Sequence, residues 1–92
     1  MSLLGDAAIA AAIERLQGWA RDGNTIRAEY RFRDFSEAVA FVNRVAEAAN
    51  RADHHPDICV RYNRVELTLA THSAGGITEK DLAMAEACDR AA

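Results

Sequence analysis

Apolar residues recur at helical spacing in three segments of the chain, and each segment predicts an amphipathic helix. The first helix is expected over residues 6–17, with Gly18 at the position where a helix commonly ends. The second is expected to begin at Asp34, which is spaced from Glu37 as in a capping box, and to end near Asn50. Each of these helices is expected to pack its apolar side against a core.

The third helix is predicted in the C-terminal segment ITEKDLAMAEACDRAA. Thr78 is the expected N-cap residue, and Asp81 follows at the third helical position, so the two residues fit a capping box. This capping role accounts by itself for the type and place of the residue at position 81.

Between the first two helices, apolar and polar residues alternate as they do in a half-buried strand. The alternation covers residues 26–33, and the dipeptide Asp22-Gly23 before it is a hairpin turn signal. With these two residues as the loop, Trp19 falls opposite Ile26, and a short strand is expected over residues 18–21.

A second strand pair is predicted beyond Pro56, over residues 58–62 and 65–71. Asn63-Arg64 is the expected two-residue turn, because Asn tolerates positive φ. In this register Arg61 lies opposite Glu66, which is a favourable pairing of charges. The predicted buried face carries Ile58, Val60, Tyr62, Val65, Leu67 and Leu69.

The elements follow one another in the order αββαββα, which predicts an α+β fold with one four-stranded antiparallel sheet and helices packed on one face. With 92 residues and no linker-like segment, the chain is expected to form a single domain over residues 1–92. Its aromatic side chains are expected in the core; they are Trp19, Tyr30, Phe32, Phe35 and Phe41.

Composition excludes several classes of function. A net charge of -3 and scattered arginines disfavour nucleic-acid binding, and no apolar run approaches the length of a membrane span. Cys59 and Cys88 lie far apart, outside any metal-ligand or redox spacing, and the start MSLLGD lacks the features of a secretory signal. A cytoplasmic location is therefore expected.

All three histidines lie between Ala49 and His72. In the predicted hairpin register His55 falls opposite His72, at the open end of the hairpin and on the face away from the helices. Imidazoles that titrate near neutral pH can act there as proton donor and proton acceptor. A single histidine before a proline is more often structural, but three that converge favour a catalytic site.

A metal site is the competing interpretation, because three histidine ligands with an open position form a catalytic zinc pattern. Sequential residues in extended backbone point to opposite sides, so His54 and His55 do not easily share one ion. We therefore expect no metal ligand among the histidines.

Together these motifs resemble the pterin-4a-carbinolamine dehydratases. The resemblance rests on HHPD beginning at His54, Tyr62 eight residues after that histidine, THSAGG around His72, and ITEKD ending at Asp81. It extends over nearly the whole chain through GW at residues 18–19, YRFRDFSEA at residues 30–38 and VA at residues 45–46.

The resemblance implies the same αββαββα fold, assembly into a homodimer or homotetramer, and a small-molecule pterin substrate. The implied reaction converts a 4a-hydroxytetrahydropterin to the quinonoid dihydropterin in pterin cofactor recycling, by histidine acid/base catalysis and without a metal or redox cofactor. His54 and His72 are expected as the acid and the base, in either order. His55 is expected to hold the pterin, and Asp81 to orient an imidazole or the substrate.

One departure from the family pattern favours an alternative function. The position four residues before the first histidine commonly holds an ionisable residue in the family, and here it holds Asn50. The alternative is a catalytically weak or inactive family member that acts as a binding or dimerisation module, as relatives do that stabilise the dimer of a transcription factor. Because all three histidines are retained, we rank the enzyme first.

Overall fold

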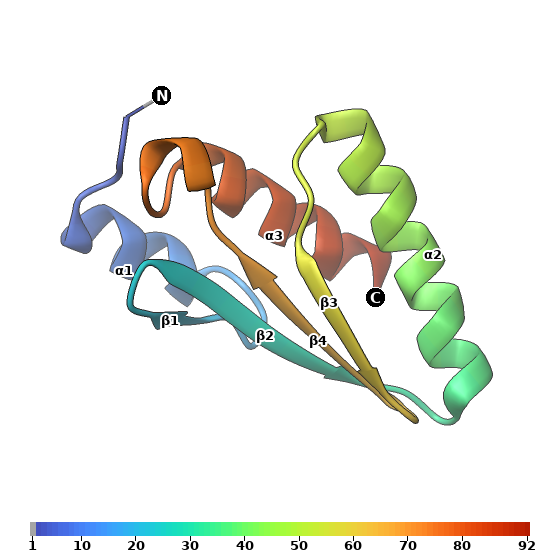
Figure 1. The fold of residues 1–92 in the computed structure, drawn as a ribbon. Coiled ribbons are helices and arrows are strands. Elements are labelled where there is room, and N and C mark those ends of the chain that lie inside the picture. Colours follow the sequence, from blue (N-terminus) through green and yellow to red (C-terminus); the bar gives the residue numbers. More distant parts are fainter. Residues whose placement is uncertain (1) are drawn as a thin grey trace.

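The computed structural model describes residues 2–92 and confirms the order αββαββα, with one additional short 3₁₀ helix (Figure 1). The helices are α1 (Asp6–Glu14), α2 (Phe35–Ala52) and α3 (Glu79–Ala91), and the 3₁₀ helix is η1 (His72–Ala74). The strands are β1 (Ala20–Asp22), β2 (Thr25–Arg31), β3 (Asp57–Arg61) and β4 (Arg64–Leu69). None of the helices in the described part of the chain is long and apolar enough to cross a membrane.

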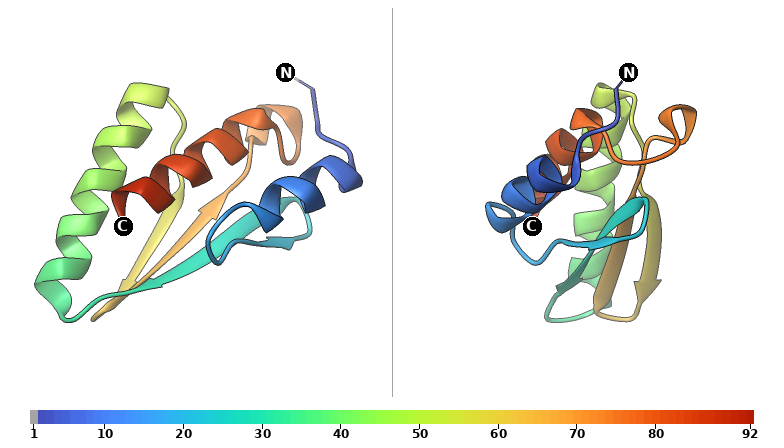
Figure 2. Two further views of the ribbon diagram at one scale, coloured as in Figure 1. Left: turned by 180° about the vertical axis from the view of Figure 1, so that it is seen from behind. Right: turned by 90° about the vertical axis from the view of Figure 1, so that its left-hand side faces the viewer.

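The four strands form one antiparallel sheet in the order β1-β2-β4-β3, so β2 and β4 are central and β3 is an edge strand. All three helices lie on the same side of this sheet, as the predicted fold class requires, and the edge-on view makes the two layers plain (Figure 2). The C-terminal end of α2 and the N-terminal end of α3 lie at the same end of the sheet, where β4 also ends (Figure 1).

The first hairpin turns one residue later than predicted. Asp22 pairs with Thr25 and Arg21 with Ile26, so the loop is Gly23-Asn24 and Trp19 precedes the strand instead of pairing with Ile26. Gly23 takes φ of 61°, a left-handed conformation that glycine adopts without steric cost, so the turn is placed where the glycine can be its first loop residue.

The second hairpin turns one residue earlier than predicted. Arg61 pairs with Arg64 and Cys59 with Glu66, so the loop is Tyr62-Asn63 and Tyr62 takes the left-handed φ of 54°. Asn63 is held from outside the hairpin, because its side-chain amide donates to the Phe32 carbonyl at 3.0 Å and its own carbonyl accepts from the Phe32 amide at 2.8 Å. This tertiary contact overrides the local preference for Asn at positive φ.

The core lies between the central strands and the helices. α1 contributes Ile9, and α2 contributes a stripe of residues at helical spacing. The fully or nearly fully buried apolar residues are Ile9, Trp19, Ile26, Ala28, Ala38, Phe41, Val45, Ala49, Val65, Leu67, Leu69, Ile77, Met84, Ala85 and Cys88.

Part of the predicted core is exposed. Ile58 and Val60 do face the same side as Val65 and Leu67, but they lie on the edge strand, where no further strand or helix covers them fully. Their exposed fractions are 39% and 37%. The predictions that Tyr62 and Phe35 are core residues were also wrong, because Tyr62 lies in the turn and the two rings stack on each other at the surface.

A polar cluster fastens the C-terminal part of α3 to the opposite end of the sheet from the histidines. The Trp19 indole N–H lies 3.0 Å from both the Tyr30 hydroxyl and an Asp89 carboxylate oxygen, and the Tyr30 hydroxyl donates to the same oxygen. Burial, and then the hydrogen bond to Asp89, raise the pKa of Tyr30 well above its usual value. The cluster fixes Trp19 and Tyr30 in the core with their polar atoms satisfied.

Candidate active site

The three histidines line a single hollow of about 360 Å³, which we call the imidazole hollow. It lies at the end of the sheet where α2 ends, β4 ends and α3 begins, and not on the sheet face away from the helices as predicted. Its lining residues are Asp53, His54, His55, Ala70, Thr71, His72, Ser73 and Lys80.

The predicted pairing of His55 with His72 was wrong, because the hairpin register is shifted. The last pair of β3 and β4 is Asp57 with Thr68, and the chain on both sides then leaves the ladder. The histidines reach the same hollow by another route: two of them follow the end of α2, and the third begins η1.

His54 is positioned by the way in which α2 ends. Asp53 takes a left-handed conformation with φ of 50°, which turns the chain, and the His54 amide then donates to the Ala49 carbonyl at 3.1 Å. The turn directs the His54 imidazole toward the first turn of α3, where its Nε2 lies 2.6 Å from Asp81 Oδ1. Since a carboxylate only accepts hydrogen bonds, the ring nitrogen is the donor.

Asp81 is held rigidly in this contact. Its side chain is completely buried, and its second oxygen, Oδ2, accepts from both the Thr71 hydroxyl and the Thr78 amide at 2.9 Å. The Thr78 hydroxyl lies 2.8 Å from that of Thr71 and accepts from the Lys80 amide, so the polar groups around the carboxylate are partnered. The predicted capping box is confirmed, but it uses only one of the two carboxylate oxygens.

The His54–Asp81 pair is suited to proton transfer. With Nε2 bound to the carboxylate, the second ring nitrogen of His54 remains to exchange a proton with a bound molecule. A carboxylate in hydrogen-bond contact also orients the imidazole and stabilises the positive charge that the ring acquires when it accepts a proton. The His54 side chain keeps 12% of its surface exposed, so it is largely shielded but reachable from the hollow.

His55 points in a different direction and has a neutral partner. Its Nε2 lies 3.0 Å from Asn50 Oδ1, which accepts the ring N–H as an amide oxygen does. Asn50 stands on the last turns of α2, so the ring is fixed against the helix even though it is exposed. The two adjacent histidines therefore have separate partners.

His72 is exposed and makes no side-chain hydrogen bond within the part of the chain that the structure describes. It begins η1, a short turn closed by Gly75 in a left-handed conformation with φ of 80°. Thr71 and Gly76 form an isolated bridge across this turn. The loop is thus anchored on both sides of His72, while the imidazole itself stays free to contact a ligand.

Comparisons with known proteins identify the family of this chain. The family model for pterin 4 alpha carbinolamine dehydratase matches residues 2–91. The chain belongs to this family. A relative from Thermomicrobium roseum with the same dehydratase name is 56% identical over 85 residues, which is 92% of this chain and 91% of the relative. Another, from Trichormus variabilis, is 49% identical over 90% of this chain and 89% of its own.

Solved structures show the same fold. The crystal structure of a transcriptional coactivator/pterin dehydratase from Brucella melitensis superimposes with a TM-score of 0.93, at 38% identity over 98% of both chains. A pterin dehydratase-like protein described as a RuBisCO assembly factor in the alpha-carboxysome has a TM-score of 0.70 at 22% identity, covering 82% of this chain and 89% of its own. The second similarity concerns the fold alone.

Membership in the family establishes the activity in general terms. The chain has pterin-4a-carbinolamine dehydratase activity, which removes water from a 4a-hydroxytetrahydropterin in pterin recycling and makes the protein a hydro-lyase. Within residues 2–92, no three His, Cys, Asp or Glu side chains are placed so that they could hold one metal ion.

Sequence reasoning missed two residues of the site. Thr71 was not singled out, although it directly precedes His72 and supports Asp81 through its buried hydroxyl. Lys80 was not singled out either, although it directly precedes Asp81 and lines the imidazole hollow. Both adjoin a predicted site residue in the sequence, and only their contacts reveal that they belong to the site.

Proposed function

We propose that His54 and His72 carry out the two proton transfers of the dehydration. One imidazole donates a proton to the 4a-hydroxyl group, which leaves as water when the C4a–O bond breaks. The other accepts the proton from N5 as the C4a=N5 double bond of the quinonoid dihydropterin forms. The substrate loses one molecule of water with no change of oxidation level, so the step consumes no redox equivalent and leaves the proton count of the protein unchanged.

The contacts of His54 carry this proposal. A buried, fully hydrogen-bonded carboxylate 2.6 Å from one ring nitrogen fixes the direction of the other nitrogen. Fixed geometry of this kind lowers the entropic cost of reaching the transition state. Asp81 is in this view a positioning residue, because it acts through the imidazole and does not line the hollow.

We assign pterin binding to His55 together with Asn50. The exposed imidazole of His55 lies at the wall of the hollow and is steadied by the Asn50 amide, so it is placed to stack on or hydrogen-bond with the flat bicyclic ring. A neutral amide supports the ring orientation without requiring a charge at position 50. The substitution of an ionisable residue by Asn50 is therefore compatible with substrate binding.

The direct test follows the absorbance decay of freshly generated 4a-hydroxytetrahydropterin with and without the protein. Because the dehydration also proceeds uncatalysed, only acceleration above the background counts. We expect the His72→Ala variant to lose roughly 100-fold or more of the catalysed rate, as is typical when a general acid or base is removed.

His72 is a suitable residue for this test because its side chain is exposed and contributes little to folding. Equal acceleration by the native chain and the variant would contradict the assignment of His72. If neither exceeds the background while circular dichroism shows both folded, the binding-module function takes first place.

We also propose that the protein is a homo-oligomer formed through the exposed edge strand β3. Here five apolar residues with exposed fractions of 36% or more lie on β3, on the turn that follows it and on the neighbouring helix α2, a surface that we call the β3–α2 surface. They are Phe35, Val39, Ile58, Val60 and Tyr62. An unpaired apolar edge is a site for strand pairing with another chain.

The sequence of β3, DICVR, fits a second copy of itself. In an antiparallel pairing about a two-fold axis at Cys59, Ile58 faces Val60 of the second copy and Asp57 faces its Arg61, and the reverse contacts follow by symmetry. The two Cys59 residues then lie directly opposite each other. This register therefore pairs each acidic side chain with a basic one and each apolar side chain with another apolar one.

Light scattering at micromolar concentration tests the assembly. We expect the native chain to be a dimer or tetramer and Val60→Lys to shift it toward the monomer, because it places a lysine opposite Ile58 on each side of the two-fold axis. Mild oxidation should cross-link the native oligomer through Cys59, whereas buried Cys88 provides an internal control. A native chain that is monomeric at these concentrations would exclude the proposal.

Two further proposals concern the domain boundaries of the protein and its location in the cell. We propose that residues 1–92 act as one dehydratase domain, since the described residues of all three helices and the sheet share one core cluster. We further propose a reducing, cytoplasmic setting, which is consistent with two cysteines that are both free.

A further inference from the structure

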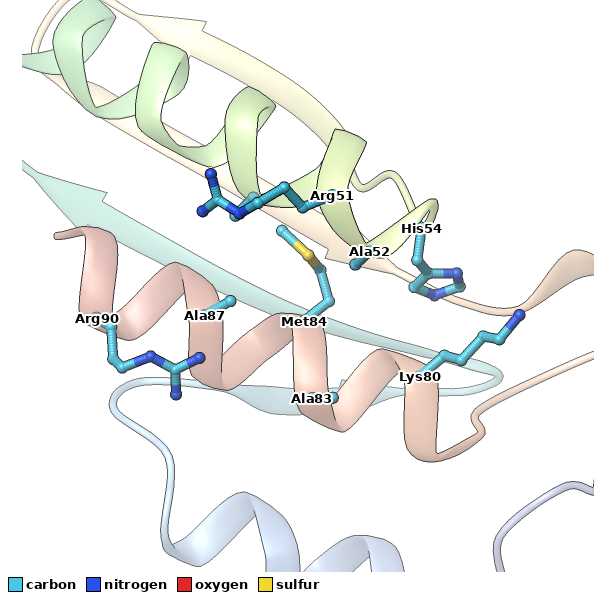
Figure 3. Close-up of a pocket in the computed structure, with 9 residues that line it drawn as sticks. Arg51, Ala52, His54, Lys80, Ala83, Met84, Ala87 and Arg90 are labelled. Atoms are coloured by element: carbon cyan, nitrogen blue, oxygen red, sulfur yellow. The ribbon is translucent and has the colours of Figure 1, made fainter.

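A second hollow adjoins the imidazole hollow along the seam between α2 and α3 (Figure 3). It has a volume of about 440 Å³, and we call it the α2–α3 groove. Its base is apolar, with the buried Met84 between the helices and half-buried alanines at positions 48 and 87. Arg51 of α2 and Lys80 and Arg90 of α3 are exposed along it.

The three cations of the groove have no ion-pair partner among residues 2–92. Some other arginines of the chain do have one: Arg21 pairs with Asp6, and Arg27 pairs with Glu66. Among the residues that the structure describes, no carboxylate lines the groove, although the chain as a whole carries a net charge of -3.

Acidic residues line the two neighbouring hollows instead: Glu47 accompanies Arg44 in the next hollow along the helices, and Asp53 lines the imidazole hollow. Positive charge is therefore concentrated in one concave place on an acidic protein. A concavity of this kind raises the local concentration of anions.

The groove and the imidazole hollow are continuous, because His54 and Lys80 line both. Figure 3 shows Lys80 extending toward His54 at one end of the groove, with Arg51 and Arg90 farther along it. Lys80 and Arg90 are ten residues apart on α3, so the cations are distributed over about 15 Å. A molecule seated against the histidines can thus extend a substituent between the two helices.

We infer that the α2–α3 groove binds an anionic side chain of the pterin substrate, a phosphate ester or a carboxylate. The inference rests on the proposed function, because it places the pterin ring against the histidines. The apolar base suits the carbon atoms of the side chain, and the arginine and lysine groups suit its terminal oxygens. The connection between the groove and the imidazole hollow favours an anion that is part of the substrate over a separate anion, because a separate anion would not need that connection.

Two substrates that differ only in the side chain test this inference. One is a 4a-hydroxytetrahydropterin with a neutral hydroxyalkyl side chain, and the other is its phosphate ester. We expect a KM about tenfold lower for the ester, which corresponds to about one charge-assisted hydrogen bond. This advantage should shrink as sodium chloride is added, because exposed charges are screened.

Arg51→Gln is the informative variant. It should bring the ratio of the two KM values close to one, because it removes the cation that α2 contributes to the groove. Arg15→Gln removes the same charge from an exposed position just after α1 and should leave the ratio unchanged. Equal KM values for both substrates with the native chain would overturn the inference and leave the dehydratase mechanism intact.

A binding measurement separates the inference from the proposed catalytic roles. Oxidised pterins with the neutral and the phosphorylated side chain do not react, and their fluorescence reports binding whether or not the chain catalyses the dehydration. If the phosphorylated pterin binds more tightly and Arg51→Gln removes this difference, the result supports side-chain binding in the groove, even if turnover is absent. The inference is overturned if the two pterins bind with equal affinity. It is also overturned if inorganic phosphate displaces both pterins equally well.

Discussion

The N-termini of α2 and α3 begin with the same kind of local motif but have different surroundings. At α2, Asp34 accepts from the Glu37 amide at 2.9 Å, near the surface. Glu37 Oε1 accepts at 3.0 Å from the Arg33 amide and not from that of Asp34, so only the N-cap half of the predicted capping box forms. At α3, the Thr78–Asp81 box is fully buried, and Asp81 also contacts His54 and Thr71.

The difference shows how a capping residue acquires a second role. A carboxylate has two oxygens, and a capping box needs only one of them. At α3 the remaining oxygen faces the end of another helix, and an imidazole occupies that place. At α2 the second oxygens of Asp34 and of Glu37, the counterpart of Asp81, both face Arg33 near the surface. These two carboxylates therefore serve the helix end and do nothing further that the structure shows.

The largest effect is expected when the second role of Asp81 is removed. Asp81→Asn keeps the size of the side chain but loses the charge that orients and stabilises the His54 imidazole. We expect the turnover number to fall by about 100-fold with a much smaller change in KM, since the imidazole contributes to the transition state more than to binding. Steady-state kinetics with the 4a-hydroxytetrahydropterin measures both quantities.

A purely structural role of Asp81 would give a different result. The variant would then unfold more easily in urea but keep its turnover number wherever it is folded. Asp81→Ala is the more disruptive variant and should lower the free energy of unfolding by about 3 kcal/mol, because it leaves the buried polar groups of Thr71 and Thr78 without their hydrogen-bond acceptor.

A smaller effect is expected at the other helix. Asp34→Ala removes an N-cap hydrogen bond and should lower the free energy of unfolding by about 1 kcal/mol. The catalysed dehydration should be unchanged, because Asp34 is the N-cap of α2 and His54 follows the opposite end of this 18-residue helix. Figure 1 shows the two ends of α2 at opposite ends of the sheet. A loss of turnover comparable to that of Asp81→Asn would show that helix capping alone accounts for the effect at α3.

A further effect concerns the C-terminal part of α3 and is absent near neutral pH, because it appears only at alkaline pH. Burial raises the pKa of Cys88 to about 12 and that of Tyr30 well above its usual value of 10, so both groups keep their protons in the folded state. In the unfolded chain they lose them from about pH 9 and pH 10 upward. The unfolded state then binds fewer protons, and stability falls as pH rises.

Urea unfolding at pH 8 to 11 measures this dependence. Each group contributes at most about 1.4 kcal/mol per pH unit, and the partly exposed Tyr30 contributes less. Tyr30→Phe should flatten the fall above pH 10 and leave the contribution of Cys88. An identical alkaline profile for the native chain and the variant would contradict the role given to the tyrosine.

The sequence by itself determined the elements and much of the site's composition. Hydrophobic periodicity correctly placed three helices and four strands, since burial of one face imposes a period of 3.6 or 2 residues on each segment. The Thr78–Asp81 capping box was also predictable, because all its contacts lie within four residues of chain. The three histidines stood out because they were confined to a short stretch with recognisable motifs.

Tertiary structure alone decided the register of the second hairpin, the exposed edge and the partners of the histidines. Moving a two-residue turn by one position shifts strand pairing by two residues, which leaves every side chain on the same face, so the apolar alternation cannot distinguish the two registers. The place of Asn63 in the turn is determined by its hydrogen bonds to Phe32. Ile58 and Val60 are exposed because β3 lies at the edge of the sheet. The contact between His54 and Asp81, 27 residues apart, exists because α2 ends where α3 begins.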